Sequence, residues 1–365
     1  MMEKEQKTFA VLTGGGDCPG LNAVIRGAAK TLLNHNCKVY GVLDGFNGLV
    51  HGKFCELNYA NLSGVLPRGG TILGTTNRDN PFHMAVQNNG KMEFCDMRDK
   101  VLANLRKYNI EALIDIGGDG TLAIGAKLAR ECGVKVVGCP KTIDNDIIGT
   151  ERTFGFDTAV AMATDAVDRL HTTAESHHRV MVLEVMGRYA GWIALYCGIA
   201  GGADAILIPE IPYDIESVAK KVNQRRADGK QFSIVVVAEG AKPVGGTICV
   251  SRVVKDSFEP LRLGGAGNKV ADDLEKITGV ECRCTVLGYL QRGGSPTAFD
   301  RMLSTRYGVA AAEACLRGEY NVMMSLQNDK IVSVDLQIAG SSSRNVPLDS
   351  ELIRTGRQIG ISFGD

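Results

Sequence analysis

The sequence has no excess charge of either sign and no long apolar run. Its 365 residues include 41 Lys plus Arg and 41 Asp plus Glu, so there is no global basic field to attract nucleic acid or anionic lipid. No run approaches the ~18 apolar residues of a membrane span, and the start, MMEKEQK, lacks the apolar region of a signal peptide. We therefore expect a cytoplasmic protein with no nucleic-acid or membrane partner, which holds any anionic ligand through local clusters.

The eleven cysteines lack the spacing of a metal site or a disulfide framework. None stand at CxxC spacing, and only Cys282 and Cys284 lie close together, so buried or free thiols are expected. The length and the 44% apolar content predict a globular protein of about two domains. Glycine is abundant, with 44 residues, and many follow apolar runs, where they allow tight turns or close approach of backbone to a ligand.

Two segments share a strand, glycine turn and helix pattern. The strand Thr8–Thr13 runs into glycines at 14–20 and a helix over 21–33, and the strand Ala112–Ile116 runs into GGDGT at 117–121 and a helix over 122–132. Free N–H groups at a helix N-terminus bind phosphate, and Asp119 beside glycines can hold Mg²⁺ against it. A purely structural turn is the alternative for the first segment and an N-capping Asp or Thr for the second. Neither segment is a Walker loop or a GxGxxG fingerprint.

The heptapeptide PKTIDND at 140–146 follows the strand signal at 134–138. In an extended loop, Thr142, Asp144 and Asp146 would face one side and Asn145 the other. With the Lys141 ammonium, these groups suit a base and a magnesium ligand acting on a hydroxyl and a phosphate. A solvated Asp/Asn-rich turn is the alternative.

The strand and helix alternation recurs four times in about 150 residues, which predicts an α/β fold with a mainly parallel sheet covered by helices on both faces. After Thr150 the pattern changes to a second α/β domain whose strand ends carry Arg188 and Glu239, with the boundary near residue 155. A loop at 68–81 could present Arg78 to a phosphate, and a solvated arginine is the alternative. Arg283, Tyr289 and Arg292 would suit a sugar phosphate if they converge.

An ordered series of motifs resembles the 6-phosphofructokinase family. The series comprises GGGDCPGLN at 14–22, GGDGT at 117–121, PKTIDND at 140–146, MGRYAGW at 186–192, PE at 209–210, AEG at 238–240 and LGYLQRGGSP at 287–296. GGDGT alone is shared with other kinases, whereas the full series is specific. The resemblance implies two doubly wound domains: a nucleotide-binding domain over 1–155 to which roughly 293–340 return, and a sugar-phosphate domain over 156–292 with part of the C-terminal tail.

The resemblance also implies transfer of a phosphoryl group from MgATP to the 1-hydroxyl of fructose 6-phosphate, in glycolysis. Asp144 would be the base, Asp119 and Asp146 the Mg²⁺-associated acids, and Thr142 and Arg188 contacts of the transferring phosphate. The donor phosphates would lie at Gly15, Arg78, Gly118, Asp119, Gly120, Thr121 and Lys141. The sugar-phosphate pocket would hold Arg179, Met186, Gly187, Glu239, Arg283, Tyr289 and Arg292. Of these, Arg179 and Arg283 would reach across from a neighbouring subunit, which implies a homo-oligomer.

The chain differs from the family's patterns at a few positions. It combines Gly120 with Lys141, whereas pyrophosphate-using members pair lysine with a second aspartate. Glycine leaves room for the nucleotide α-phosphate, so ATP is favoured and pyrophosphate is the alternative. Asn77 precedes Arg78, Tyr289 replaces a common histidine, and His171 stands where some members have an effector-binding arginine. A catalytically silent sugar-phosphate sensor is a third hypothesis, disfavoured because a binding protein needs no base.

Overall fold

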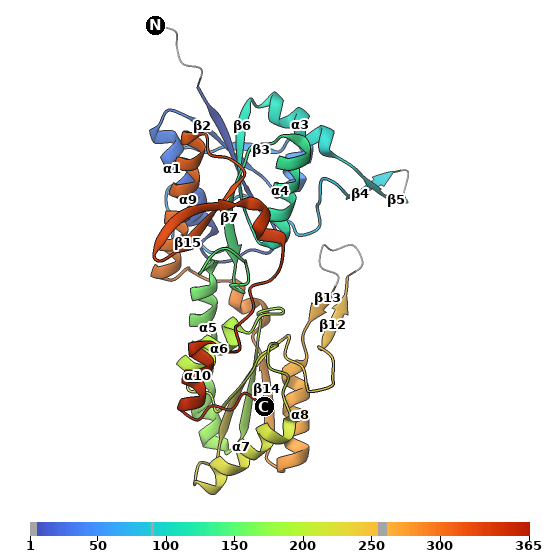
Figure 1. The fold of residues 1–365 in the computed structure, drawn as a ribbon, viewed down its shortest axis with the longest axis vertical. Helices are drawn as coiled ribbons and strands as arrows, with labels where there is room; N and C mark the ends of the chain where they lie inside the picture. Colours follow the sequence, from blue (N-terminus) through green and yellow to red (C-terminus); the bar gives the residue numbers. More distant parts are fainter. Residues whose placement is uncertain (1–5, 89–90, 255–260) are drawn as a thin grey trace.

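Two lobes lie one above the other along the long axis of the molecule (Figure 1). The computed structural model describes residues 6–88, 91–254 and 261–365. The upper lobe contains an eight-stranded sheet with the order β16-β15-β7-β6-β1-β2-β3, in which β8 also pairs with β7, and the lower lobe a four-stranded sheet with the order β10-β11-β9-β14. The fold is thus α/β with mainly parallel sheets, as predicted.

The sheet of the upper lobe is parallel in its centre and antiparallel at its edges. β1 pairs in parallel with β2 and β6, and β7 with β6 and β15, while β3 and β16 are antiparallel edge strands. The strands are β1 (Thr8–Thr13), β2 (Lys38–Val42), β3 (Phe54–Glu56), β6 (Ile110–Gly117), β7 (Val136–Thr142), β8 (Phe154–Gly155), β15 (Val322–Gln327) and β16 (Lys330–Asp335).

Alternate side chains of β1 explain why helices cover both faces of this sheet. Phe9 and Val11 pack in one apolar cluster with α1 and α9, whereas Ala10 and Leu12 pack in another with α2, α3 and α4. Because neighbouring side chains of a strand point to opposite faces, a wholly apolar strand requires cover on both. The helices are α1 (Leu21–Asn34), α2 (Phe46–His51), α3 (Arg98–Lys107), α4 (Asp119–Cys132) and α9 (Ala298–Arg317).

All strand pairs of the lower sheet are parallel, and helices again lie on both faces. Met181 and Leu183 of β9 pack with α5 and α6, while Val180 and Val182 pack with α7 and α8. The elements are α5 (Phe156–His177), β9 (Val180–Val185), α6 (Trp192–Ala200), β10 (Ala205–Leu207), α7 (Ile215–Ala227), β11 (Ser233–Ala238), α8 (Ala266–Thr278) and β14 (Cys282–Val286).

One apolar cluster runs through both lobes. It joins Phe9 of β1 to α1 and α9, continues along α5, and includes Leu183 of β9 and Ile234 of β11. The cluster is continuous because α5 contacts β8 and α9 of the upper lobe as well as β9 and β11 of the lower lobe. The upper and lower sheets therefore share one buried core.

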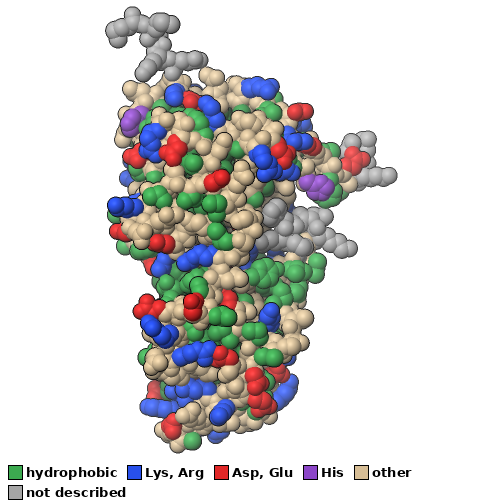
Figure 2. Space-filling view, in the orientation of Figure 1, with side chains coloured by type: hydrophobic (Ala, Val, Ile, Leu, Met, Phe, Trp, Pro, Cys, Tyr) green, Lys and Arg blue, Asp and Glu red, His purple; other side chains and the backbone are tan. Residues whose placement is uncertain are grey.

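Two hairpins, β4 (Met84–Asn88) with β5 (Lys91–Cys95) and β12 (Val250–Val253) with β13 (Leu261–Leu263), project from the same side of the molecule (Figure 1). The remaining elements are the 3₁₀ turns η1 (Gly288–Arg292) and η2 (Leu336–Gly340) and the helix α10 (Glu351–Gln358). Acidic and basic side chains mix over the face shown in Figure 2, in keeping with the balanced charge. Among the described residues, no helix combines the length and apolarity needed to span a bilayer.

Two predicted strand ends differ from those observed. β7 continues through Pro140 to Thr142, because β8 pairs with its last residues, Lys141 opposite Phe154 and Thr142 opposite Gly155. The sequence pattern over 283–290 predicts one continuous strand, whereas β14 ends at Val286 and the turn η1 follows. Pairing with β8 thus lengthens β7, whereas the pairing of β14 with β9 stops at Val286 and the strand ends there. The proposed division at residue 155 falls where β8 ends and α5 begins, and it stays a prediction.

Candidate active site

Three loops meet at one edge of the upper sheet. β1, β6 and β7 are adjacent parallel strands, so the turns that follow Thr13, Gly117 and Thr142 leave the sheet side by side. Ligands of open α/β sheets bind outside the carboxyl ends of the strands. The glycine turn at 14–16, the start of α4 and the loop at 143–146 therefore share one site.

The glycine turn at 14–16 lies against the loop that carries Arg78. Gly15 has a left-handed φ of 77°. Its N–H donates to the Thr76 carbonyl oxygen at 3.0 Å, and its carbonyl oxygen accepts from Thr75 Oγ1 at 2.7 Å. A Cβ at Gly15 would lie 3.3 Å from Thr121 Oγ1 and 3.4 Å from Lys141 Nζ, so bare backbone borders a hydroxyl and an ammonium. Arg78 itself is exposed at the edge of this group.

The helix α4 begins at Asp119, three residues earlier than predicted, because GGDGT supplies its cap and first turn. Gly118 is the N-cap and contributes no side-chain cap, which leaves N–H groups of the first turn available to a ligand. Gly120 and Thr121 belong to this turn. The partial positive charge of the helix terminus favours phosphate at this position.

Arg188 of the lower lobe lies between carboxylates of the upper lobe. Its Nη1 is 3.5 Å from Asp119 Oδ1 and 3.5 Å from Asp146 Oδ2. Asp144 is buried at 2% exposure, and its Oδ1 has no hydrogen-bond partner among the described residues. A buried acceptor without a partner is costly unless a ligand completes it. Loops far apart in sequence are thus brought together around Asp144.

The backbone of the loop at 143–146 is turned, not extended as predicted. Asn145 adopts a left-handed φ of 54°, and its Oδ1 accepts from the Thr153 N–H at 3.0 Å. Asp144 N–H donates to Thr142 Oγ1 at 3.0 Å. The side chains of Asn145 and Asp146 nevertheless point to different partners, as expected. The Asn145 side chain is bonded to Thr153, whereas Asp146 lies beside Arg188.

The turn over 186–191 fixes the direction of Arg188. Gly187 has a φ of 144°, and a Cβ there would lie 2.5 Å from the Ala190 carbonyl oxygen, so glycine is required. Arg188 itself has a left-handed φ of 52°, and its N–H donates to Glu239 Oε1 at 3.0 Å. The carboxylate of Glu239 thus holds this strained turn in place.

Burial dominates the acid–base properties of the site. It raises the pKa of Asp146 to about 7, with a further contribution from the Asp144 carboxylate and an opposing one from Arg188. Burial and Asp144 likewise raise the pKa of Glu239 to about 7. Burial also lowers the pKa of Lys141, whose Nζ donates to the Gly16 carbonyl oxygen. The crowded carboxylates favour a cation, or a proton, between them.

We expect Glu239→Gln to stabilise the ligand-free protein, increasingly as pH rises from about 4.5 to about 7. The folded pKa of Glu239 lies above the ordinary value of 4.5, so the folded state binds the proton more tightly and wild-type stability falls as pH rises through this window. The variant lacks this loss, which amounts to at most about 3 kcal/mol. Thermal unfolding at several pH values measures the difference. Glu313→Gln, on the exposed surface of α9, is the control, and a pH-independent difference for Glu239→Gln would contradict the expectation.

Part of the predicted sugar-phosphate pocket lies at the same site. Arg292 Nη1 donates to the Asp17 carbonyl oxygen at 3.2 Å, next to the glycine turn. Met186 N–H donates to Gln291 Oε1 at 2.8 Å, which joins the end of β9 to η1. Tyr289 belongs to the same turn η1, and its side chain is 78% exposed.

Arg179 and Arg283 lie at the opposite end of the lower sheet. Arg179 precedes the six-residue strand β9, so it is about 20 Å from Met186 at the other end. Its Nε is 2.7 Å from Glu281 Oε2, and Arg283 pairs with the other oxygen of the same carboxylate. The two arginines form one cluster, but it is separate from Asp144 within a single chain.

Sequence reasoning missed several residues that support the site. Arg344 lies in a Ser-rich stretch and contacts the loop at 143–146, and nothing local in the sequence marks it. Glu184 stands inside the apolar strand β9 and accepts from the N–H groups of Gly265 and Gly267 at the start of α8, at 3.0 and 2.8 Å. A charge within an apolar run was the available signal for Glu184.

His171, at the position where some family members have an effector-binding arginine, bonds within the lower lobe. Its Nε2 lies 2.7 Å from the Gly201 carbonyl oxygen.

Comparison with known proteins agrees with the motif series. The chain is 52% identical over 362 residues to ATP-dependent 6-phosphofructokinase 2 of Clostridium perfringens, covering 98% of this chain and 99% of the relative. It is 50% identical over 365 residues to ATP-dependent 6-phosphofructokinase of Chloroflexus aggregans, covering 100% and 99%.

Structural similarity extends to phosphofructokinase of Pichia pastoris in the T-state, with a TM-score of 0.79 and 33% identity over 93% of this chain and 36% of that one. The family model described as Phosphofructokinase matches residues 8–315, which include every motif of the predicted series. The chain therefore belongs to the phosphofructokinase family.

Proposed function

We propose that the protein is an ATP-dependent 6-phosphofructokinase, which transfers the terminal phosphoryl group of MgATP to the 1-hydroxyl of fructose 6-phosphate in glycolysis. The observation that carries the proposal is the position of Arg188, which lies between Asp119 and Asp146 where three loops meet, with the buried Asp144 two residues before Asp146. A base beside a guanidinium suits phosphoryl transfer, which depends on positioning and on positive charge at the phosphate oxygens.

The donor phosphates would lie along the glycine turn and the first turn of α4. Gly15, Gly118 and Gly120 offer backbone without side-chain obstruction, and the Thr121 hydroxyl and Lys141 ammonium border the same space. Arg78 would reach the terminal phosphate from the loop beside Gly15. Gly120 leaves room for a nucleotide α-phosphate, which favours ATP over pyrophosphate.

Mg²⁺ would be held by Asp119 and Asp146. The two carboxylates fit such an ion, because Mg²⁺ in kinases uses one or two carboxylates together with substrate phosphates. No group of three metal-binding side chains occurs in the described part of the chain, in keeping with an ion that arrives with the nucleotide. When bound, Mg²⁺ would neutralise charge on the phosphate oxygens.

Asp144 would accept the proton of the sugar 1-hydroxyl while that oxygen forms its bond to the terminal phosphorus. The bond from this phosphorus to the bridging oxygen breaks, and ADP leaves with the electron pair. Arg188 and the Thr142 hydroxyl would contact the transferring group from opposite lobes. Arg188 then offsets negative charge where it develops.

The sugar phosphate would be bound by the lower lobe and by a neighbouring copy. Met186, Gly187, Glu239, Tyr289 and Arg292 would come from the same chain, while Arg179 and Arg283 would complete the site of a neighbour. Support for the shared site is the distance of these two arginines from Asp144 within one chain. Self-association in the cytoplasm is part of the proposal.

Assays with two phosphoryl donors test this function. Formation of fructose 1,6-bisphosphate is measured with ATP and, separately, with pyrophosphate, at equal Mg²⁺ concentrations. We expect product with ATP and at most trace product with pyrophosphate. Faster turnover with pyrophosphate would overturn the donor assignment. Binding of fructose 6-phosphate with no product from either donor would indicate a silent sensor.

A further inference from the structure

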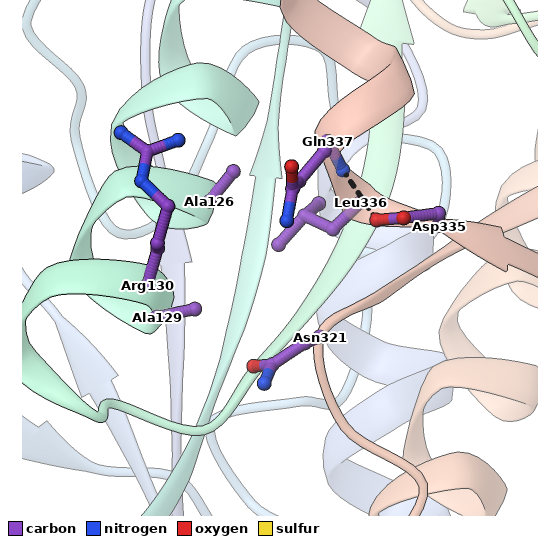
Figure 3. Close-up of a pocket in the computed structure, with 7 residues that line it drawn as sticks. All are labelled: Ala126, Ala129, Arg130, Asn321, Asp335, Leu336 and Gln337. Carbon is purple, nitrogen blue, oxygen red and sulfur yellow. Dashed lines mark hydrogen bonds between the residues drawn. The ribbon is translucent and has the colours of Figure 1, made fainter.

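The chain beyond β16 crosses from the upper lobe to the lower lobe (Figure 1), and it contacts the loop at 143–146 on the way. It begins on α4, where Leu336 and Gln337 of η2 face Ala126 and Ala129 across a cavity of about 100 Å³ (Figure 3). It ends in α10 of the lower lobe, where Gly356 lies under the Phe363 ring. The stretch over 341–350 between these anchors is called here the crossing segment.

Arg344 of the crossing segment binds two consecutive carbonyl groups of the loop at 143–146. Its N–H donates to the Asp146 carbonyl oxygen at 2.7 Å, and its Nη1 donates to the Asn145 carbonyl oxygen at 3.1 Å. Ser343 also forms an antiparallel bridge with Ile147. The segment thus runs antiparallel to the loop at this point, and Arg344 contacts the peptide groups on both sides of Asp146.

This support matters because the loop is strained at the same place. Asn145 is left-handed, a conformation that residues other than glycine adopt uncommonly and that surrounding contacts hold here. One of these contacts is the Thr153 N–H on the side-chain oxygen, and Arg344 supplies another on the main-chain oxygen. The strained residue separates Asp144 from Asp146.

The same arginine is fixed to the lower lobe beside Arg188. The Arg344 carbonyl oxygen accepts from Trp192 Nε1 at 2.8 Å, and the guanidinium carbon lies 4.3 Å from the centre of the Trp192 ring. Two residues further on, the Val346 N–H donates to Glu210 Oε1 at 2.8 Å, and that oxygen also accepts from the Gly191 N–H at 3.0 Å. Gly191 ends the turn that carries Arg188, and Trp192 directly after it begins α6.

We propose that Arg344 is a positioning residue, which holds the loop of Asp144 and Asp146 in register with the turn of Arg188. It links the two halves of the reacting centre through main-chain carbonyl groups of the loop at 143–146 and through the Trp192 side chain, and it touches no reacting atom. The inference rests on the proposed phosphotransferase function. A displacement of the reacting groups by about 1 Å lowers turnover by roughly 10²-fold, so loss of this link acts on kcat.

Steady-state kinetics of Arg344→Ala with ATP and fructose 6-phosphate test the proposal. We expect kcat to fall about 10–100-fold while the KM of either substrate changes little. Arg344→Lys keeps a cation that can reach one carbonyl group, so its kcat should lie between those of the wild type and Arg344→Ala. Arg344 lines a groove of about 390 Å³, so added guanidinium can enter, and at concentrations too low to unfold the protein it should restore part of kcat in Arg344→Ala.

Three further variants keep the experiment decisive. Arg354→Ala, which removes an exposed arginine of α10 with a 4.0 Å ion pair, should leave kcat unchanged. Asp144→Asn should not respond to guanidinium. If Arg344→Ala does not fold, Trp192→Phe keeps a ring below the guanidinium and removes only the N–H donor, and a several-fold loss of kcat is expected.

Two outcomes would overturn the inference. One is wild-type kcat in folded Arg344→Ala. The other is a fall in kcat that guanidinium and Arg344→Lys both fail to reduce. An inactive wild-type protein would instead contradict the proposed function, so the two failures are distinguishable.

Discussion

Replacing Asp144 by asparagine is expected to lower kcat by about 10²- to 10⁴-fold, because the amide cannot take the proton of the attacking hydroxyl. The substitution keeps size and shape, and the site is buried, so the surrounding contacts of Thr142 and Arg188 should persist. The effect therefore belongs to chemistry and not to folding. Initial rates with saturating ATP and fructose 6-phosphate measure it.

Binding measurements separate this loss from a loss of affinity. Calorimetric titration of Asp144→Asn with fructose 6-phosphate should give affinity near that of the wild type, because the sugar-phosphate contacts are made elsewhere. Asp349→Asn makes the same chemical change at an exposed position in the crossing segment and should retain full activity. Turnover of Asp144→Asn within a few-fold of wild type would show that another group is the base.

Replacing Arg188 by alanine is expected to lower kcat about 10³-fold or more, as loss of a guanidinium at the transferring phosphate does in other phosphotransferases. Nη1 of Arg188 is 3.5 Å from both Asp119 and Asp146, so its loss also leaves two carboxylates facing each other. Arg188 opposes the rise in the pKa of Asp146, and without it Asp146 should hold its proton to higher pH.

In the Arg188 variant the Mg²⁺ concentration for half-maximal rate should therefore depend more strongly on pH, because a proton on Asp146 competes with the ion up to higher pH. Kinetics at several Mg²⁺ concentrations and pH values check this. Arg188→Lys retains a charge without the planar fork and should recover part of the rate. Arg169→Ala, at a 77% exposed side chain paired with Asp165, serves as the control. An unchanged Mg²⁺ requirement would show that Arg188 does not act on the metal-binding acids.

Local patterns predicted most elements of the fold but not every strand end. Apolar runs such as Thr8–Thr13 and the glycines after them mark strand ends that the structure confirms. The end of β7 depends on pairing with β8, and the end of β14 on the turn η1. Those contacts form only in the folded chain, so a pattern read along the sequence does not contain them.

The same distinction applies to the candidate site. Asp119 and Asp144 follow adjacent strands of one parallel sheet, so their proximity could be anticipated from topology. The approach of Arg188 depends on how the lobes pack, and the contact of Arg344 depends on a segment that returns from the far end of the chain. The strand pattern placed Arg188 at a strand end, but only the family resemblance implied its contact with the transferring phosphate. The assigned roles of all these residues stay predictions.

The return of late segments to the upper lobe bears on how the protein folds during synthesis. α1 packs against α9, and β7 pairs with β15, although the whole lower sheet lies between them in sequence. During synthesis, the amino-terminal half of the chain is therefore made before β15 and α9. Until these two elements are made, the β7 edge of the sheet and the apolar face of α1 remain uncovered. The lower lobe has all its strands together in the chain and can form while the upper one is incomplete. Chaperone dependence in the cell should thus concentrate on the amino-terminal half of the nascent chain.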